Sequence, residues 1–372
     1  MFDKFFLCYF ETTRECNLDC AYCMSKTDGP LPGPELDTDE VKHLVLDEVK
    51  KYSSKSAVAF SGGEFMLRDD YREILKYNAS LGQWSFINTN GTLLNKENLL
   101  EIKEITSGKI VFVFSLNSLN QEIHGKGRDD RAAITINKAE LCREYDVPYF
   151  FVTTISKNNL DGLKELGEYT KEKNIPILRS PFVPRGEGGN LKELLFDRDD
   201  MKEKIHPFLR ENYLSYISFT PFFASSRFFE KGWLGLNIAI KQLGCQAGKG
   251  YAGITPEGEV APCVHLLDSE VKCGNIRETP FSEILENNQI FKELRSRDNL
   301  KGKCGKCYYK NTCGGCRALA YHHTGDYLEE DPTCFFQPED ETTRSELEEM
   351  QNENVKKFAD FLRKSSPWKE LF

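Results

Sequence analysis

Three cysteines crowd into one short loop near the start of the chain. In Glu11-Thr-Thr-Arg-Glu-Cys16-Asn-Leu-Asp-Cys20-Ala-Tyr-Cys23 they follow the spacing C-x3-C-x2-C, just after the apolar run 5–10. Iron–sulfur cubanes normally take four cysteine thiolates, so three thiolates can hold one cluster and leave one iron free to bind another ligand. A zinc site or a redox dithiol is the alternative, although zinc sites usually pair two such cysteine elements.

Composition narrows the class of protein. The chain has 372 residues, enough for two domains, and its 40% apolar content is ordinary for a globular protein. The formal charge of −9 argues against a nucleic-acid partner. No apolar run reaches the ~18 residues of a membrane span, and no window resembles a signal peptide. We therefore expect a soluble, cytoplasmic protein without a membrane partner.

Thirteen cysteines are many for such a chain. With no export signal, and with spacings typical of metal ligands, clusters are a better interpretation than disulfides. Ten of the thirteen fall into the motifs described in this section. Of the others, Cys8 and Cys142 lie in apolar patterns and are expected in the core, whereas Cys273 has no such context.

Strand-like and helix-like segments alternate from residue 5 to residue 182. Repeated βα units of this kind predict a parallel sheet, and six of them suggest an α/β fold with a partial (β/α)6 TIM-like barrel, followed by a small cysteine-rich domain. The expected strands are 5–12, 56–60, 84–89, 109–116, 148–155 and 176–182, and the expected helices are 38–52, 69–81, 95–106, 132–145 and 159–173.

Polar and glycine-rich stretches follow these strands. Barrels of this type place their chemistry on the loops after the strand carboxyl ends, so a shared site is expected there. The stretches are Ser61-Gly62-Gly63-Glu64, Asn88-Thr89-Asn90-Gly91-Thr92, Ser115-Leu116-Asn117, Thr153-Thr154 and Phe182-Val183-Pro184-Arg185-Gly186.

A second group of cysteines follows residue 245. Cys245, Gly258 and Cys263 follow C-x12-G-x4-C, the segment 253–260 reads as a β-hairpin, and a further run follows C-x2-C-x5-C-x2-C. That run and the last cysteine are Cys304, Cys307, Cys313, Cys316 and Cys334. Seven cysteines in about 90 residues indicate a region held by metal centres, with zinc as the alternative to iron.

The first cysteine loop closely resembles that of radical S-adenosylmethionine (SAM) enzymes. The resemblance implies that Cys16, Cys20 and Cys23 hold a [4Fe-4S] cluster whose free iron binds SAM, and that the reduced cluster cleaves SAM to a 5′-deoxyadenosyl radical. By the same resemblance Gly62, Gly63 and Glu64 match the family motif that binds the SAM amino group. Further expected SAM contacts are Tyr22, Asn90, Ser115, Asn117 and Thr154.

The later cysteines resemble a SPASM domain, which carries two auxiliary iron–sulfur clusters. The resemblance assigns one cluster to Cys304, Cys307, Cys313 and Cys334 and the other to Cys245, Cys263 and Cys316. Cys273 is a candidate fourth ligand of the second cluster; otherwise that site is open or holds a smaller cluster. The implied organisation is a radical SAM barrel over 1–190, a bridge over 191–240, a SPASM domain over 241–340 and a C-terminal helix over 341–372.

Two substrate classes fit the resemblance. The stretches Cys313-Gly-Gly-Cys-Arg-Ala-Leu-Ala320 and Val183-Pro184-Arg185-Gly186 look most like the branch that modifies tetrapyrrole side chains. Maturation of a ribosomally made peptide by crosslinking or epimerisation is the alternative, and an iron–sulfur electron carrier is the non-enzyme alternative. Arg179, Arg185 and Arg317 are candidate partners of substrate carboxylates. The expected chemistry is anaerobic, with a reductant such as flavodoxin or ferredoxin.

Overall fold

The computed structural model describes residues 5–26, 33–129, 131–205, 215–217, 244–311, 313–338 and 345. Contacts within the chain divide it into two compact units, and neither is continuous in sequence. The first unit comprises Met1–Val152, Pro184–Lys192 and Ala247–Lys292; the second comprises Thr153–Val183, Glu193–Gln246 and Glu293–Phe372. The boundaries expected at 190 and 240 remain predictions.

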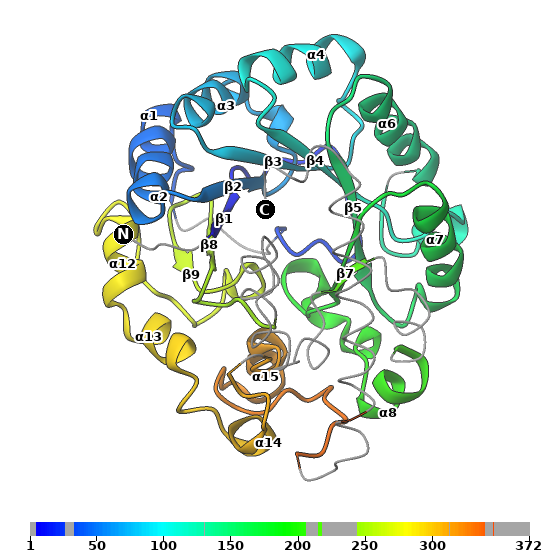
Figure 1. Cartoon of the computed structure of the whole chain (residues 1–372), viewed down its shortest axis with the longest axis vertical. Coiled ribbons are helices and arrows are strands. Elements are labelled where there is room, and N and C mark those ends of the chain that lie inside the picture. Colours follow the sequence, from blue (N-terminus) through cyan, green and yellow to red (C-terminus); the bar gives the residue numbers. More distant parts are fainter. Residues whose placement is uncertain are drawn as a thin grey trace. The chain divides into compact units, whose positions relative to one another are not determined.

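A curved, mostly parallel sheet forms the centre of the first unit (Figure 1). Its strand order is β5-β4-β3-β2-β1-β8-β9, in which only β9 runs antiparallel to its neighbour. The strands are β1 (Phe6–Glu11), β2 (Ser56–Ser61), β3 (Trp84–Thr89), β4 (Ile110–Ser115), the start of β5 (Tyr149–Ile155), β8 (Tyr251–Ile254) and β9 (Val260–Ala261). Every residue of β2 is buried, as expected where helices cover a parallel sheet.

Helices line the outer side of this sheet (Figure 1). The first runs without a break through α1 (Thr38–Glu40), a π-helical turn (Val41–Leu46) and α2 (Asp47–Tyr52), and it begins at a capping box between Asp37 and Glu40. The others are α3 (Tyr71–Ser80), α4 (Lys96–Ile105), α5 (Gln121–His124), α6 (Ala132–Glu144), α12 (Phe281–Asn287) and the first half of α13 (Gln289–Ser296). Short 3-10 turns cover Phe65–Leu67, Gly186–Asn190 and Val264–Leu266.

The second unit pairs β6 (Ile177–Pro181) in parallel with β7 (Ser215–Ile217). Its helical segments are α7 (Leu160–Glu172), α8 (Arg198–Asp200) with a π-helical turn (Met201–Ile205), α14 (Gly302–Lys306) and α15 (Arg317–Thr324), and a 3-10 turn covers Lys192–Leu194 at its border with the first unit. A buried apolar cluster brings α7 and the π-helical turn against the cysteine-rich segment. Its members include Leu163, Phe196, Met201, Tyr309, Cys313 and Phe336.

The structure confirms the α/β class with a curled parallel half-barrel and places all six expected strands within two residues of their predicted limits. The hairpin over 253–260 is confirmed, but its first strand β8 also pairs in parallel with β1 and so belongs to the first unit. The residue pattern over 199–216 also predicts a helix, and this prediction is wrong at its end, because Ser215–Ile217 is a strand. The C-terminal helix expected over 341–372 lies outside the described residues, except for position 345.

The structure bears on the expected burial of two cysteines and on the search for a membrane-spanning helix. Cys8 and Cys142 are fully buried in the core, as predicted. Burial raises the pKa of both thiols well above the usual range, so they remain protonated. Among the described residues, no helix has the length and apolar character needed to cross a bilayer.

The start of α4 offers a test of the local folding argument. Asn95 and Asn98 form a reciprocal capping box, with each side-chain oxygen 2.9 Å from the other residue's backbone nitrogen. Losing such a cap typically costs about 1 kcal/mol. We expect Asn95→Ala to speed amide hydrogen exchange in the first turn of α4, whereas Glu104→Ala, an exposed change on the same helix, should not. Equal exchange in both variants would contradict the capping role.

Candidate functional site

The cysteine loop follows β1 and lines a cavity in the first unit. Cys16 is exposed, and Cys20 and Cys23 are partly buried. Cys16 and Cys23 face a cavity of approximately 450 Å³. Its lining also includes Arg14, Asn17, Leu18, Asp19, Ser25, Lys26, Gly63 and Asp129. Two of the three predicted cluster ligands thus share one cavity with a glycine of the predicted SAM motif.

The two glycines of that motif press against the cysteine loop itself. The backbone N–H of Gly63 donates to the carbonyl of Thr13 at 2.7 Å, and the N–H of Glu64 donates to the carbonyl of Glu15 at 2.8 Å. A Cβ on Gly63 would lie 1.8 Å from the Glu15 carbonyl oxygen, and one on Gly62 would lie 2.4 Å from that of Thr13. Only glycine permits this approach, so both glycines fix the loop that carries Cys16.

Glu64 is buried, and its carboxylate holds the end of β3. It accepts hydrogen bonds from the Thr89 hydroxyl at 2.9 and 3.0 Å and from the Asn90 backbone N–H at 3.0 Å. Burial raises the pKa of Glu64 to about 6, although these hydrogen bonds oppose the shift. The acid predicted to bind SAM therefore also joins the loops after β2 and β3.

The other predicted SAM contacts in the first unit lie around the same loop. The Asn90 amide donates to the Asn17 side chain at 2.9 Å, directly after Cys16. The Asn117 amide donates to the Tyr22 hydroxyl, and Ser115 is partly buried. Thr154 belongs to the second unit, so its predicted role remains untested.

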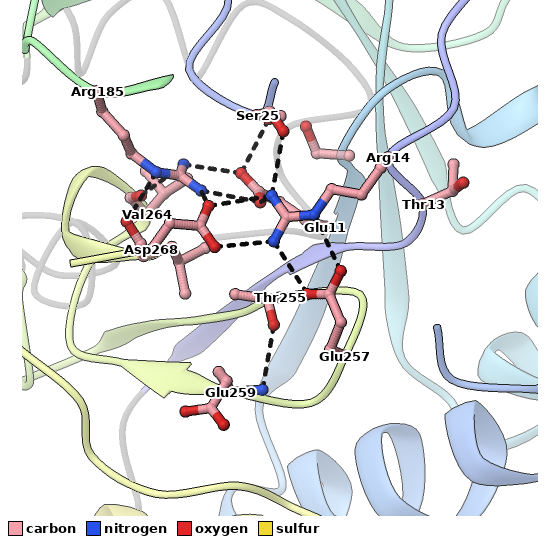
Figure 2. Close-up of polar contacts among 12 residues, drawn as sticks. Glu11, Thr13, Arg14, Ser25, Arg185, Thr255, Glu257, Glu259, Val264 and Asp268 are labelled. Carbon is pink, nitrogen blue, oxygen red and sulfur yellow. Dashed lines mark hydrogen bonds and ion pairs between the residues drawn. The ribbon is translucent and has the colours of Figure 1, made fainter. Parts of the chain in front are cut away.

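Arg185 closes the base of the cysteine loop. Its guanidinium donates to both carboxylate oxygens of Glu11 at 2.8 and 3.0 Å and to Asp268 at 2.5 Å (Figure 2). It also donates to the carbonyls of Val264 and Leu267, both at 2.9 Å. The prediction that Arg185 pairs with a substrate carboxylate is wrong, because this buried side chain is taken up by the protein's own acceptors.

Arg14 extends this ion-pair cluster from within the cysteine loop. It donates to Glu257 at 2.9 and 3.1 Å, to Asp268 at 2.8 and 3.0 Å and to the Ser25 carbonyl at 3.1 Å (Figure 2). Although burial alone would raise it, the pKa of Asp268 is lowered by its hydrogen bonds and charge interactions with Arg14 and Arg185. Both ends of the loop are therefore tied to the segment 257–268.

Gly186 and Glu187 hold the far end of the loop through backbone contacts. The Glu187 N–H donates to the carbonyls of Cys23 and Lys26 at 3.0 and 3.1 Å. Gly186 has a φ of +58°, and a Cβ there would lie 2.5 Å from each of these two carbonyl oxygens. The segment directly after Arg185 is thus packed against the third cysteine.

In the second unit, four cysteines line one cavity. They are Cys304, Cys307, Cys313 and Cys334, the set that the resemblance assigns to one auxiliary cluster. Backbone N–H groups donate to three of their sulfur atoms: Asp331 to Cys304 at 3.4 Å, Tyr309 to Cys307 at 3.4 Å and Gly315 to Cys313 at 3.5 Å. Such N–H···S contacts are one of the means by which proteins tune iron–sulfur clusters.

The protonation state of these cysteines depends on metal. Burial is the largest cause that raises the pKa of Cys304, Cys307, Cys313 and Cys334, so as free groups they are thiols, and metal binding would release their protons. In the described part of the chain, no three histidines, cysteines or carboxylates lie close enough for a single metal ion. The donor set and the N–H···S contacts suit a cluster with several irons.

The other predicted cluster is divided between the units. Cys263 belongs to the first unit, and Cys245 and Cys316 belong to the second, so this ligand set remains a prediction. Cys316 caps α15 through a contact from the Leu319 N–H to its sulfur at 3.5 Å. Cys273 is buried, and burial raises its pKa to about 12.

The prediction that Arg317 pairs with a substrate carboxylate is also wrong, whereas the same prediction for Arg179 stays a prediction. Arg317 is fully buried and donates to three backbone carbonyls and to the Cys304 sulfur. Arg179 is 2% exposed. Sequence reasoning missed Glu11, Arg14 and Asp268 as site residues; the only local signal was the position of the first two beside the cysteines.

Comparison with known proteins identifies two families whose models match parts of this chain. A profile described as the Radical SAM superfamily matches residues 10–169, and one described as an iron–sulfur cluster-binding domain, SPASM, matches residues 245–308. An "AdoMet-dependent heme synthase" from Methanosarcina barkeri is 36% identical over 343 residues, which cover 88% of this chain and 96% of the relative.

More distant similarities extend to a maturase and a peptide cyclase. The "Mycofactocin maturase MftC" of Mycolicibacterium smegmatis is 26% identical, with 87% of this chain and 81% of the relative covered. Among solved structures, native anSMEcpe with bound AdoMet matches with a TM-score of 0.68 and 19% identity, covering 96% of this chain and 99% of the other. At that identity, the structural likeness speaks for the fold alone.

The segment after Arg185 provides a test with a matched control. In Gly186→Ala, the new methyl group meets two carbonyl oxygens, and the left-handed backbone costs roughly 1–2 kcal/mol in addition. Gly189→Ala, three residues later, meets nothing within 4 Å. We expect Gly186→Ala alone to speed amide exchange over residues 16–26 and to lower iron incorporation. Unchanged exchange would show that this segment does not hold the loop.

Glu64 makes a specific contribution to the pH dependence of stability. Because its pKa is higher in the folded chain than its ordinary value of 4.5, its stabilising contribution is fully present below pH 4.5 and is lost as the pH rises through 6. Glu64→Gln removes that titration. Between pH 7.5 and pH 5, wild type should gain about 1–2 kcal/mol in free energy of unfolding relative to Glu64→Gln, measured by urea denaturation. The exposed control Glu97→Gln should show no such gain.

Proposed function

Because this chain belongs to the radical SAM superfamily and carries a SPASM domain, we propose that it modifies the side chains of an iron tetrapyrrole in a haem-forming reaction. Relatives over nearly its whole length are synthases and maturases, so the chain is an enzyme and not merely an electron carrier. The observation that carries the proposal is the cavity shared by Cys16, Cys23 and Gly63 in a chain 36% identical to a haem synthase.

A [4Fe-4S] cluster with AdoMet is the cofactor of this family, and when bound it supplies a 5′-deoxyadenosyl radical that abstracts hydrogen from the substrate. We assign its protein ligands to Cys16, Cys20 and Cys23. The residues around these three cysteines hold the cysteine loop in position. Gly62 and Gly63 bring β2 against the loop, and Glu64 holds the end of β3 beside it.

We assign AdoMet contacts to the residues that share this part of the first unit. The glycine loop supports this assignment because it lies at the cavity, and Asn90 and Asn117 do so because their amides reach Asn17 and Tyr22 of the cysteine loop. Ser115, at the end of β4, completes the set in the first unit, and Thr154, which lies in the part of β5 that belongs to the second unit, is assigned from the family resemblance.

We further propose two auxiliary clusters. The cavity lined by Cys304, Cys307, Cys313 and Cys334 supports the first. The second, on Cys245, Cys263 and Cys316, rests on the family pattern, with Cys273 as its candidate fourth ligand. A flavodoxin or ferredoxin would supply the electron that starts the cleavage of AdoMet.

The tetrapyrrole substrate is favoured over a peptide by sequence identity. The haem synthase is 36% identical to this chain, and the relative named as a peptide cyclase is 26% identical. Iron coproporphyrin III is a suitable probe because it carries the iron and ring of haem with only methyl and propionate side chains. Conversion to haem, followed by mass spectrometry, supports the proposal; conversion of a peptide instead would favour the alternative.

The variant Cys16→Ala tests whether the first cluster and the two auxiliary clusters bind independently. Three cubanes hold about twelve irons, and we expect the variant to retain about eight and to form no 5′-deoxyadenosine from AdoMet and dithionite. The matched control is Cys142→Ala, which changes a buried core cysteine and should keep the full iron content and activity. Loss of all iron in Cys16→Ala would contradict independent clusters.

A further inference from the structure

Two guanidinium groups are buried in the cysteine-rich part of the second unit. Arg297, directly after α13, is 1% exposed, and Arg317, the first residue of α15, is 0% exposed. Arginine side chains stay charged in proteins. A buried charge needs a compensating partner, because removal from water is costly.

Neither guanidinium has a carboxylate within ion-pair distance among the described residues. Arg297 donates to the carbonyls of Cys313, at 3.3 Å, and Cys245. Arg317 donates to the carbonyls of Gly315, Tyr327 and Glu329 at 3.3, 3.0 and 2.7 Å and to the Cys304 sulfur at 3.5 Å. The buried Arg185, in contrast, pairs with two carboxylates.

Two details describe how the Arg297 guanidinium is accommodated beside the cysteines. The Nε of Arg297 is buried and has no hydrogen-bond partner. A Cβ on Gly314 would lie 1.1 Å from the Arg297 Nη1, so only glycine at 314 leaves room for the guanidinium beside Cys313. One donor of Arg297 is therefore unsatisfied, although the glycine at 314 leaves room for the whole guanidinium group.

The other charged groups near the cavity do not cancel these charges. Asp331 is buried, and its carboxylate accepts from the N–H groups of Cys316 and Thr333 and from the Thr333 hydroxyl. Lys303 and Lys310 line the cavity and add positive charge. Asp326 interacts with Arg317 through its charge but forms its ion pair with Lys301, and Glu330 forms its ion pair with Arg198.

We propose that Arg297 and Arg317 are positioning residues that supply the counter-charge for an anionic iron–sulfur cluster held by Cys304, Cys307, Cys313 and Cys334. The inference rests on the proposed auxiliary-cluster assignment. An oxidised [4Fe-4S] core with four thiolates carries a net charge of −2, and reduction adds a further negative charge. Buried positive charge favours the reduced state, since net charge and hydrogen bonds to sulfur set the potential of such clusters. The two arginines therefore raise the reduction potential of this cluster.

The test is a redox titration of the reconstituted holoprotein, followed by electron paramagnetic resonance. The Cys16→Ala background removes the first cluster, and Cys307→Ala identifies the signal of the cluster in question. We expect Arg297→Met and Arg317→Met each to weaken reduction about tenfold, or about 59 mV for one electron. Arg297→Lys and Arg317→Lys, which keep the charge, should restore at least half of the shift.

Arg295→Met is the matched control, because it removes the same charge two residues earlier from a side chain that is only partly buried. Its potential should stay at the wild-type value. Unchanged potentials in both methionine variants would overturn the inference. Loss of the cluster in the methionine variants alone would support a charge requirement, whereas loss in the lysine variants as well would overturn it.

A separate outcome reports on the proposed function. If Cys307→Ala removes neither iron nor a paramagnetic signal, the auxiliary-cluster assignment is wrong, and the inference fails with it. If Cys307→Ala removes the signal but the arginine variants do not move its potential, only the inference fails. The two failures are therefore distinguishable in one set of proteins.

Discussion

The bidentate pair between Glu11 and Arg185 is the contact on which the first site depends. Glu11 ends β1 immediately before the cysteine loop, and both partners are buried. Breaking a buried pair by removing one partner typically costs about 3–5 kcal/mol, because the other charge is left uncompensated. Arg185 also holds Asp268 and the carbonyls of Val264 and Leu267. The start of the loop is thereby fixed to segments that lie far beyond it in the sequence.

Glycines hold the cysteine loop in place at its other contacts. Gly63 meets the backbone at Glu15, and Gly186 meets the carbonyls of Cys23 and Lys26. In each case, a side chain would occupy space that the backbone of the loop fills. The cysteine loop is consequently held by protein contacts on both sides of Cys16 and Cys23, so much of its geometry is set before a cluster binds, which lowers the ordering cost of binding.

Patterns among neighbouring residues in the sequence predict those structural features that depend on nearby residues. The strands, the cysteine loop and the grouping of Cys304, Cys307, Cys313 and Cys334 follow from periodicity, spacing and family resemblance. The pairing of Glu11 with Arg185 spans 174 residues, and no local pattern encodes a contact at that distance. The parallel pairing of β8 with β1 was missed for the same reason, since a hairpin sequence fixes its own turn but not the neighbour of its outer strand.

The two units neutralise buried arginine in different ways, and this difference bears on how each depends on metal. Arg14 and Arg185 are matched by carboxylates that the chain itself supplies. Arg297 and Arg317 are matched by carbonyl dipoles and a sulfur atom, which offset a full charge only partly. A cluster with four thiolates would complete that balance, so cluster binding should stabilise the second unit more than the first, in the way that metal binding is coupled to folding elsewhere. Charge balance thus links the arrangement of the cysteine-rich region to the redox state of the cluster that it is proposed to hold.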